Sequence, residues 1–298
     1  KKMEDSNSYK LKGELEISNN DDIYNYDIEV SHKDNKYYKV VMENKSNSYV
    51  QVILKNDDGV YIVTPSLNKS FKFQSEWPYD NSQIYLYDSL IKDIENDNER
   101  KYKVTEDEYV FITKVKYPNN TNLVKQKIVF NKKLKLKEVL IYDNNSIVRM
   151  KMKFNNIEFN PSFDDDYFKL NNVMSTFSDI DDEISVFNEV IYPLFLPSGT
   201  KLVDEEKIKK DNGERVIMTF EGEKPFLLVE ETINVEDEFT IIPTYGEPYL
   251  LMDTLGIMTD NSLSWVSNGI EYYIVSDVLK QNELIEIAQS IYSLPTMK

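Results

Sequence analysis

Residues 57–78 decide the fold, and they read DDGVYIVTPSLNKSFKFQSEWP. Residues 60–63 form a run of β-branched and aromatic side chains, and further on Phe71 and Phe73 alternate with polar neighbours. The segment between them, Thr-Pro-Ser-Leu-Asn at 64–68, has the composition of a turn. Two such runs on either side of a turn predict a β-hairpin.

A helix is expected directly after this hairpin. Trp77-Pro78 ends the second strand, because proline lacks the N–H that a sheet requires. Between residues 79 and 94 the apolar spacing changes from two to the period of a helix. We expect this helix to return across the sheet and to pack on its concave side through Ile84, Tyr87, Leu90, Ile91 and Ile94.

Alternating strands flank the hairpin and the helix on both sides. Each places apolar side chains on one face and polar side chains on the other, as half-buried antiparallel strands do. Turns rich in asparagine join several of them, which is typical of a large antiparallel sheet. The strands are expected at residues 9–17, 24–30, 38–42, 50–54, 109–115, 123–130, 134–142 and 147–159.

The C-terminal part predicts two further hairpins and a last helix. Strands at 215–220 and 226–231 flank a Glu-Gly-Glu-Lys turn, and Asn268-Gly269 is the strongest hairpin signal in the chain. The last helix is expected to follow Asn282 or Ser276. Its apolar positions are Leu284, Ile287, Ala288, Ile291 and Tyr292.

Charge divides the chain in two. The chain holds 35 Lys+Arg and 52 Asp+Glu, a net charge of −17. Residues 178–298 contain 8 of these basic residues and 24 of the acidic ones, so residues 1–177 are close to neutral. We therefore predict a boundary between Asn171 and Glu183, with one domain at 1–177 and an acidic domain at 178–298. Nucleic acid and anionic lipid are unsuitable partners for the acidic part.

The sequence also resembles a known family. Residues 58–78 with the helix after them, and the segment Phe163–Leu170, resemble the LolA/RseB-like lipoproteins, in particular the GerS/YdcC type of spore-forming Gram-positive bacteria. The resemblance implies a mainly β (α+β) fold: a curved antiparallel half-barrel sheet with a covering helix, followed by a smaller α+β domain. The C-terminal part resembles an uncharacterised module of Gram-positive envelope proteins.

The resemblance also implies a place outside the cytoplasm. Members of this type carry a signal segment and a lipidated cysteine, which would tether the chain to a membrane from a point upstream of residue 1. The chain starts with Lys1 and enters a strand within a few residues, so we expect that such a segment has been removed. No apolar run approaches the roughly 18 residues that a membrane-spanning helix needs.

Little in the sequence indicates catalysis. The chain has no cysteine, and its single histidine, His32, is expected in an exposed turn rather than in a triad or a metal site. The acidic clusters at 164–166 and 179–183 lack the spacing of a calcium loop and are expected to be solvated. We expect no catalytic residue, no cofactor and no metal.

A basic run at residues 132–137 reads KKLKLK. In a strand this run would place Lys133, Lys135 and Lys137 on one face, with Leu134 and Leu136 on the other. A solvated strand face is favoured over a phosphate-binding patch.

Aromatic residues supply the candidate binding site. The 21 Tyr, 14 Phe and 2 Trp are numerous enough to fill a wide core and still line a concave face. Most of them are expected in the core. The candidate apolar binding face consists of Tyr61, Phe71, Phe73, Trp77, Leu90 and Ile94.

Two functions fit this face. The first is a non-enzymatic protein that binds another envelope or cell-wall protein in sporulation or germination, and the GerS-type resemblance implies support of a cortex amidase. The alternative is a carrier that holds an acyl chain or a lipoprotein lipid on the concave face. A hydrolase is disfavoured by the single histidine and the absence of cysteine.

Overall fold

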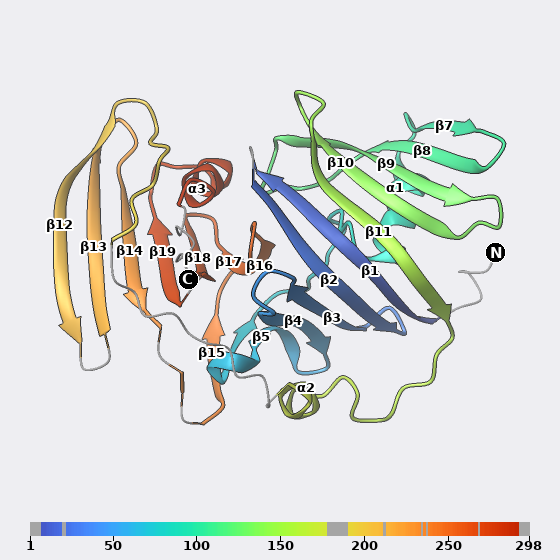
Figure 1. Ribbon diagram of the computed structural model, residues 1–298, viewed down its shortest axis with the longest axis horizontal. Coiled ribbons are helices and arrows are strands. Elements are labelled where there is room, and N and C mark those ends of the chain that lie inside the picture. Colours follow the sequence, from blue (N-terminus) through green and yellow to red (C-terminus); the bar gives the residue numbers. More distant parts are fainter. Residues whose placement is uncertain are drawn as a thin grey trace.

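A computed structural model of the chain describes residues 7–19, 22–177, 190–210, 213–233, 235–236, 238–267 and 269–291. In these residues one sheet of twelve strands and one of seven lie side by side along the long axis (Figure 1). Three α-helices accompany them: α1 (Tyr87–Asn96), α2 (Leu170–Thr176) and α3 (Gln281–Ala288). The predicted fold class, a mainly β protein with a curved sheet and a smaller α+β part, is confirmed.

The first sheet has the strand order β15-β6-β5-β4-β3-β2-β1-β11-β10-β9-β8-β7. All neighbours pair antiparallel except β15 and β6, which run parallel. The deciding stretch forms the predicted hairpin of β5 and β6 around a 3-10 turn. The strands are β1 (Ser8–Asn19), β2 (Asp22–Lys33), β3 (Tyr37–Asn44), β4 (Val50–Asn56), β5 (Gly59–Thr64), β6 (Lys69–Phe73), β7 (Lys101–Val104), β8 (Glu108–Lys114), β9 (Leu123–Asn131), β10 (Leu136–Asp143), β11 (Val148–Phe159) and β15 (Thr240–Thr244).

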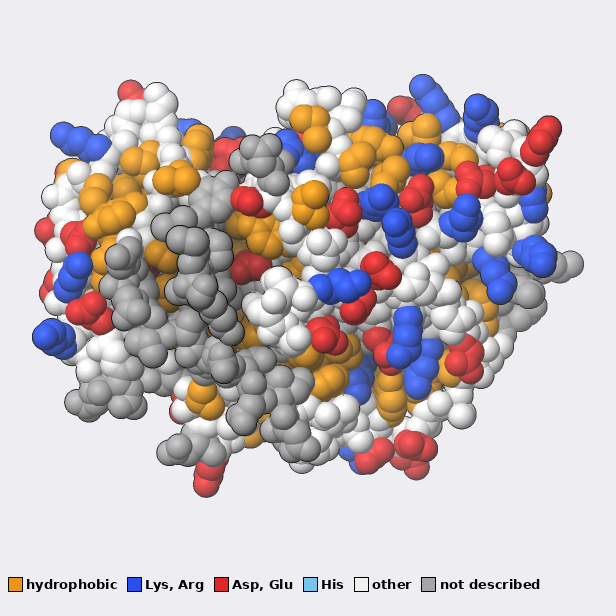
Figure 2. Space-filling view, viewed as in Figure 1, with side chains coloured by type: hydrophobic (Ala, Val, Ile, Leu, Met, Phe, Trp, Pro, Cys, Tyr) orange, Lys and Arg blue, Asp and Glu red, His pale blue; other side chains and the backbone are white. Residues whose placement is uncertain are grey.

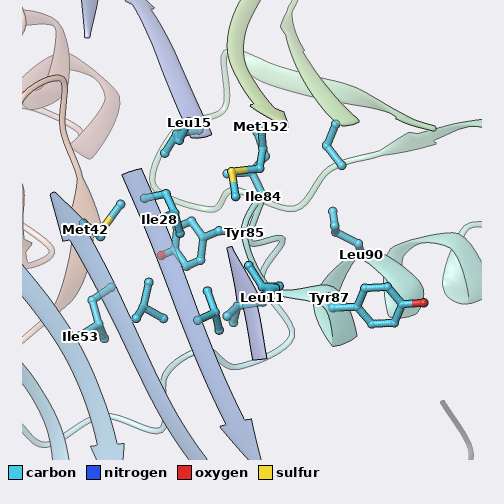
Figure 3. Close-up of a cluster of buried hydrophobic side chains, with 14 of the residues drawn as sticks. Leu11, Leu15, Ile28, Met42, Ile53, Ile84, Tyr85, Tyr87, Leu90 and Met152 are labelled. Carbon is cyan, nitrogen blue, oxygen red and sulfur yellow. The ribbon is translucent and has the colours of Figure 1, made fainter. Parts of the chain in front are cut away.

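One face of this sheet, here called the inner face, carries the main hydrophobic core. Leu11, Ile28, Met42 and Ile53 project from β1 to β4 toward the chain segment that follows β6 (Figure 3). That segment, residues 77–94, crosses the inner face as predicted and buries Leu90 there. Each of these strands turns every second side chain toward this core. The sheet curves around the core because this removes the apolar side chains from water.

The helix within this segment is shorter than predicted. It begins at Tyr87, and residues 79–86 form turns. Asp80-Asn81-Ser82 favours turns over helix, and the Ser89 hydroxyl accepts a hydrogen bond from the Gln83 N–H across them. The apolar residues before the helix are therefore buried from an irregular backbone.

The opposite, outer face is also covered over β3 to β5. Val52, Leu54 and Val63 pack there against Phe168 and Val173, which belong to the segment ending in α2. Strands that are buried on both faces carry continuous apolar runs, which explains the run at residues 60–63. In the segment at 163–170 that carries the family resemblance, residues 165–168 form a turn, and α2 begins at Leu170.

The second sheet has the order β12-β13-β14-β19-β18-β17-β16, and α3 packs on one of its faces. Leu284, Ile287, Ala288 and Ile291 are buried against it as predicted, whereas Tyr292 and Asn268 lie outside the described residues. The strands are β12 (Thr200–Lys210), β13 (Gly213–Gly222), β14 (Phe226–Thr232), β16 (Glu247–Leu250), β17 (Leu255–Met258), β18 (Ser262–Ser267) and β19 (Ile270–Val275).

The two expected starting points of α3 are wrong. Its N-cap is Lys280, and the side chain of Glu283 accepts a hydrogen bond from the Lys280 N–H. The hydroxyl of Ser276 instead accepts the N–H groups of Val278 and Leu279 in the turn before the helix. The hydrogen bond from the Lys280 N–H to the Glu283 side chain fixes the start of the helix at Lys280, so Ser276 does not act as its N-cap.

Two segments from the C-terminal part bind the first sheet. The strand β15 pairs with β6, and the Asn68 side chain in the β5–β6 turn donates to the carbonyl of Glu236. At the other end of the inner face, the Tyr26 hydroxyl donates to the Met252 carbonyl at 2.7 Å. Gln51 accepts the N–H of Leu255 at 2.6 Å, and Leu255 enters the main core. Whether residues 1–177 and 178–298 are independent folding units stays a prediction.

The basic run does not form the predicted strand face. Lys132 to Lys135 lie in the turn between β9 and β10, where Leu134 adopts a φ of 60° and is exposed. The Asn131 side chain accepts the N–H groups of Lys133 and Lys135 and so holds the turn. The alternation starts at Leu136, which is buried.

We expect Leu90→Ala to lower the free energy of unfolding by about 2 to 5 kcal/mol, because the Leu90 side chain is 0% exposed and its removal leaves a cavity. Denaturant unfolding followed by circular dichroism measures the change. Leu134→Ala, in an exposed turn, is the matched control and should cost under about 0.5 kcal/mol. A cost of Leu90→Ala below about 1 kcal/mol would show that residues 77–94 act as a loose lid.

We expect Gln51→Ala to weaken the attachment of residues 251–255, since it leaves the Leu255 N–H without its partner in a buried setting. The cost should be about 1 to 3 kcal/mol in unfolding experiments, accompanied by faster proteolysis near residue 253. Gln74→Ala, at an exposed glutamine, is the control. Equal stability of the two variants would contradict the role given to Gln51.

Candidate functional site

Most of the candidate apolar face lies together, in the core. Phe73, Trp77 and Leu90 are buried on the inner face of the first sheet, with Phe71 and Ile94 at the edge of the same cluster. Tyr61 does not join them. In the β5–β6 pairing Tyr61 stands opposite Lys72 and packs on the outer face, whereas its neighbours Val60 and Ile62 stand opposite the phenylalanines.

Little room remains on the inner face. A hollow of about 50 Å³ lies between Trp77, Tyr85, Tyr117 and Tyr249. Pockets that hold small molecules or acyl chains have volumes of about 300 to 1,000 Å³. In this conformation the chain's own residues 77–94 occupy the place that the carrier hypothesis gives to a lipid.

A buried polar cluster fixes α1 to the sheet. The carboxylate of Asp88, in the first turn of α1, accepts hydrogen bonds from Tyr9 at 2.7 Å and from Tyr38 at 3.0 Å. The negative charge lies where the helix dipole favours it. Burial next to this carboxylate raises the pKa of both tyrosines well above 10. Asp88 therefore holds the helix by charge-assisted hydrogen bonds.

His32 belongs to the same cluster, and the expectation of an exposed turn is wrong. The strand β2 continues through His32, whose ring lies 4.8 Å from that of Tyr9 and 4.6 Å from that of Tyr38. Neither ring nitrogen has a hydrogen-bond partner among the described residues. Burial lowers the pKa of His32, so the neutral imidazole fills core space between the tyrosines.

The larger hollow lies between the two sheets. A cleft of about 630 Å³ is bounded on one side by the ends of β1, β10 and β11 and on the other by α3 and residues 194–195. This volume falls in the range of binding sites, and such sites are frequent where two units meet. Amide side chains are abundant in the lining, including Asn122, Asn144 and Asn282.

Hydrogen bonds across the cleft hold its walls together. The Asn122 side chain donates to Glu286 of α3 at 3.2 Å, and the Asn19 side chain donates to the Gln289 carbonyl at 3.0 Å. Leu194 and Phe195 stand at the cleft with 75% and 42% of their surface exposed. The cleft thus combines a polar floor with two exposed apolar side chains, which suits the contact of a protein surface.

One ion pair at the cleft fixes the β10–β11 turn. Arg149 Nε donates to the Asp143 carboxylate at 2.7 Å. Burial opposes ionisation of Asp143, but hydrogen bonds from the Ile147 N–H and from Arg149 outweigh it and hold the pKa of Asp143 below its usual value. Asp143 is ionised at neutral pH and serves as a structural acceptor.

Comparison with known proteins gives one decisive relative. Sporulation protein YdcC of Bacillus subtilis (strain 168) is 38% identical over 295 residues, which cover 97% of this chain and 87% of the relative. The chain belongs to the YdcC family of sporulation proteins. No family model matches the chain.

Solved structures resemble this YdcC-family chain at low scores. A chain of the Pseudomonas aeruginosa MucA/MucB complex has a TM-score of 0.31 and 10% identity, covering 96% of this chain and 93% of its own. A chain of the complex between the CwlD amidase and the GerS lipoprotein of Clostridioides difficile has a TM-score of 0.26 and 18% identity, covering 52% and 88%. The family assignment rests on the sporulation relative.

Two further observations concern chemistry. Within the described ranges, no three His, Cys, Asp or Glu side chains are grouped to hold a metal ion. No helix of the described residues is long and apolar enough to cross a membrane.

The second sheet contains a buried carboxyl group that no sequence motif indicates. Glu230 of β14 is completely buried, and burial raises its pKa to about 7. One of its oxygens accepts the Ile191 N–H at 3.1 Å, and the other has no partner among the described residues. The strand pattern contained the signal, since Phe226, Leu228 and Glu230 share one face.

We expect Glu230→Gln to stabilise the chain more at pH 8 than at pH 5. The carboxyl group of Glu230 has a pKa of about 7 in the folded state and about 4.3 in the unfolded state. Between these values the folded state keeps a proton that the unfolded state loses. The contribution of Glu230 to the free energy of unfolding therefore falls as pH rises from about 4.3 through 7. A neutral glutamine avoids that cost, a gain of about 1 to 3 kcal/mol at pH 8.

Urea unfolding of wild type and variant at both pH values checks this expectation. Glu221→Gln, at an exposed glutamate, is the matched control and should show no pH-dependent difference from wild type. The same difference between Glu230→Gln and wild type at pH 5 and pH 8 would contradict it.

Proposed function

We propose that this YdcC-family chain acts without catalysis, as an extracytoplasmic protein that binds another envelope or cell-wall protein during sporulation or germination. In this proposal a lipid anchor upstream of residue 1 tethers it to a membrane. The observation that carries the proposal is the filled inner face, which leaves about 50 Å³ for a lipid, while the cleft between the sheets offers about 630 Å³ and exposed apolar side chains.

The cleft supports a protein partner for two reasons. Leu194 and Phe195 are exposed at it, and apolar and aromatic anchors of this kind contribute most of the energy of protein interfaces. The part of the chain that follows residue 177 is strongly acidic, so a partner with a basic surface would approach it faster and bind it more selectively. The resemblance to GerS-type lipoproteins suggests a cortex amidase as this partner.

The alternative of an acyl-chain or lipoprotein carrier requires a rearrangement. A lipid could enter the inner face after residues 77–94 had moved away, which would break the hydrogen bonds of Asp88 to Tyr9 and Tyr38. Breaking two buried charge-assisted bonds costs several kcal/mol. The partner-protein function therefore ranks first.

We expect the tagged chain to capture a specific envelope protein from sporulating cells, and Leu194→Asp with Phe195→Asp to abolish the capture. Each substitution places a charge at the proposed contact, which should weaken binding by at least about tenfold. Quantitative mass spectrometry of the captured proteins measures the loss. Leu134→Asp, an exposed leucine in the first sheet, is the matched control and should capture normally.

Two results would count against the proposal. One is capture that is unchanged in the double variant, which would remove the cleft from the interface. The other is an acyl ligand retained by the purified chain in native mass spectrometry, which would favour the carrier.

A further inference from the structure

The outer face of β7 to β11 carries an ordered set of lysines. The strand register places Lys101, Ile112, Lys127, Leu140 and Lys151 in one row across five neighbouring strands. Neighbouring strands lie about 4.8 Å apart, so successive lysines in this row are roughly 10 Å from one another. Lysine and aliphatic side chains thus alternate across the sheet.

These lysines are poorly neutralised. Lys101, Lys127 and Lys151 form no ion pair within 4 Å with any residue that the structure describes. In the next row along the strands Lys114 and Lys125 stand directly opposite each other; Lys114 pairs with Glu99 at 2.9 Å, and Lys125 donates to the Ser146 hydroxyl at 3.1 Å. Glu16 of β1 borders the row on its far side. Glu108 and Glu138 also lie on this face, with Glu138 opposite Lys153, and the lysines of the five strands outnumber these carboxylates.

We propose that this lysine face, the outer face of β7 to β11, lies against the anionic surface of a lipid bilayer. Lysine stems spread over apolar surface while the ammonium groups reach headgroup phosphates, and the aliphatic residues between them contact the interface. Figure 2 shows lysines and apolar side chains together at the upper right, over these strands, with acidic side chains among them. The proposal goes beyond binding of a partner protein and does not depend on it.

The side-chain chemistry favours a bilayer over a nucleic acid or a specific phosphate ligand. Recognition of a defined phosphate group uses the bidentate geometry of arginine, but Arg149 on β11 is occupied by Asp143. Proteins that bind single-stranded nucleic acid stack the bases on several aromatic side chains. On this face the ring of Tyr142 is already covered by the ammonium group of Lys125. Lysines that act as point charges suit a fluid surface of many equivalent phosphates.

The net charge of −17 does not oppose this contact. The acidic excess belongs to residues 178–298, whose sheet lies at the opposite end of the molecule from β7 to β10 (Figure 1). Charges act over a Debye length of about 8 Å at physiological salt, so the bilayer would respond to the lysine face and little to the acidic sheet. The separation of charge would orient the chain, with the acidic part turned away from the membrane.

Sedimentation with vesicles tests the proposal, using the 298-residue chain without any lipid anchor. We expect binding to vesicles of phosphatidylglycerol and phosphatidylcholine, none to phosphatidylcholine alone, and loss of binding when salt is raised to about 0.5 M. The triple variant K101Q/K127Q/K151Q should bind on the order of a hundredfold more weakly. The control K36Q/K201Q/K209Q has the same change of charge elsewhere and should bind as wild type does.

Three results would overturn the proposal. They are equal binding of both triple variants, absence of binding to anionic vesicles, and stronger binding to soluble polyphosphate than to vesicles at equal phosphate concentration. The last would assign the lysine face to an anionic polymer. Partner capture through the cleft is measured separately, so failure of one proposal leaves the other testable.

Discussion

The inner face of the first sheet is apolar from β6 to β9, and the structure depends on how that face is covered. The chain covers it with its own residues 77–94, which no strand pairing holds in place. Asp88 provides the fixed point, since its two hydrogen bonds join the start of α1 to β1 and β3. A charge that is buried in this way is acceptable because each oxygen has a donor and the helix dipole supports it.

The second constraint is the polar joint between the two sheets. Tyr26 and Gln51 present hydrogen-bonding groups within the largely apolar inner face, and residues 251–255 satisfy them with backbone groups. A joint of this kind is selective, because any other packing would leave buried polar atoms unpaired.

Local patterns in the sequence predict the hairpin, most strands and the buried stripe of α3, since these depend on periodicity alone. The sequence does not show which face Tyr61 occupies, because the face of a strand residue follows from the register, and in a continuous apolar run such as residues 60–63 both faces look alike. The burial of His32 is not visible in its own segment, because Tyr9 and Tyr38 on neighbouring strands cause it. The cleft could not be predicted, since its walls come from segments more than 100 residues apart.

The parallel pairing of β15 with β6 also constrains the order in which the chain can be assembled. Ser70 and Ile241 are partners, so β6 is an open edge until the ribosome has made residues 240–244. An unpaired edge next to an apolar hairpin is an aggregation hazard during synthesis. Once β15 has docked, it forms the edge of the sheet, and Pro243 leaves a further strand with one N–H fewer to pair with. Residues 240–244 therefore cover a strand edge that belongs to a much earlier part of the chain, residues 69–73.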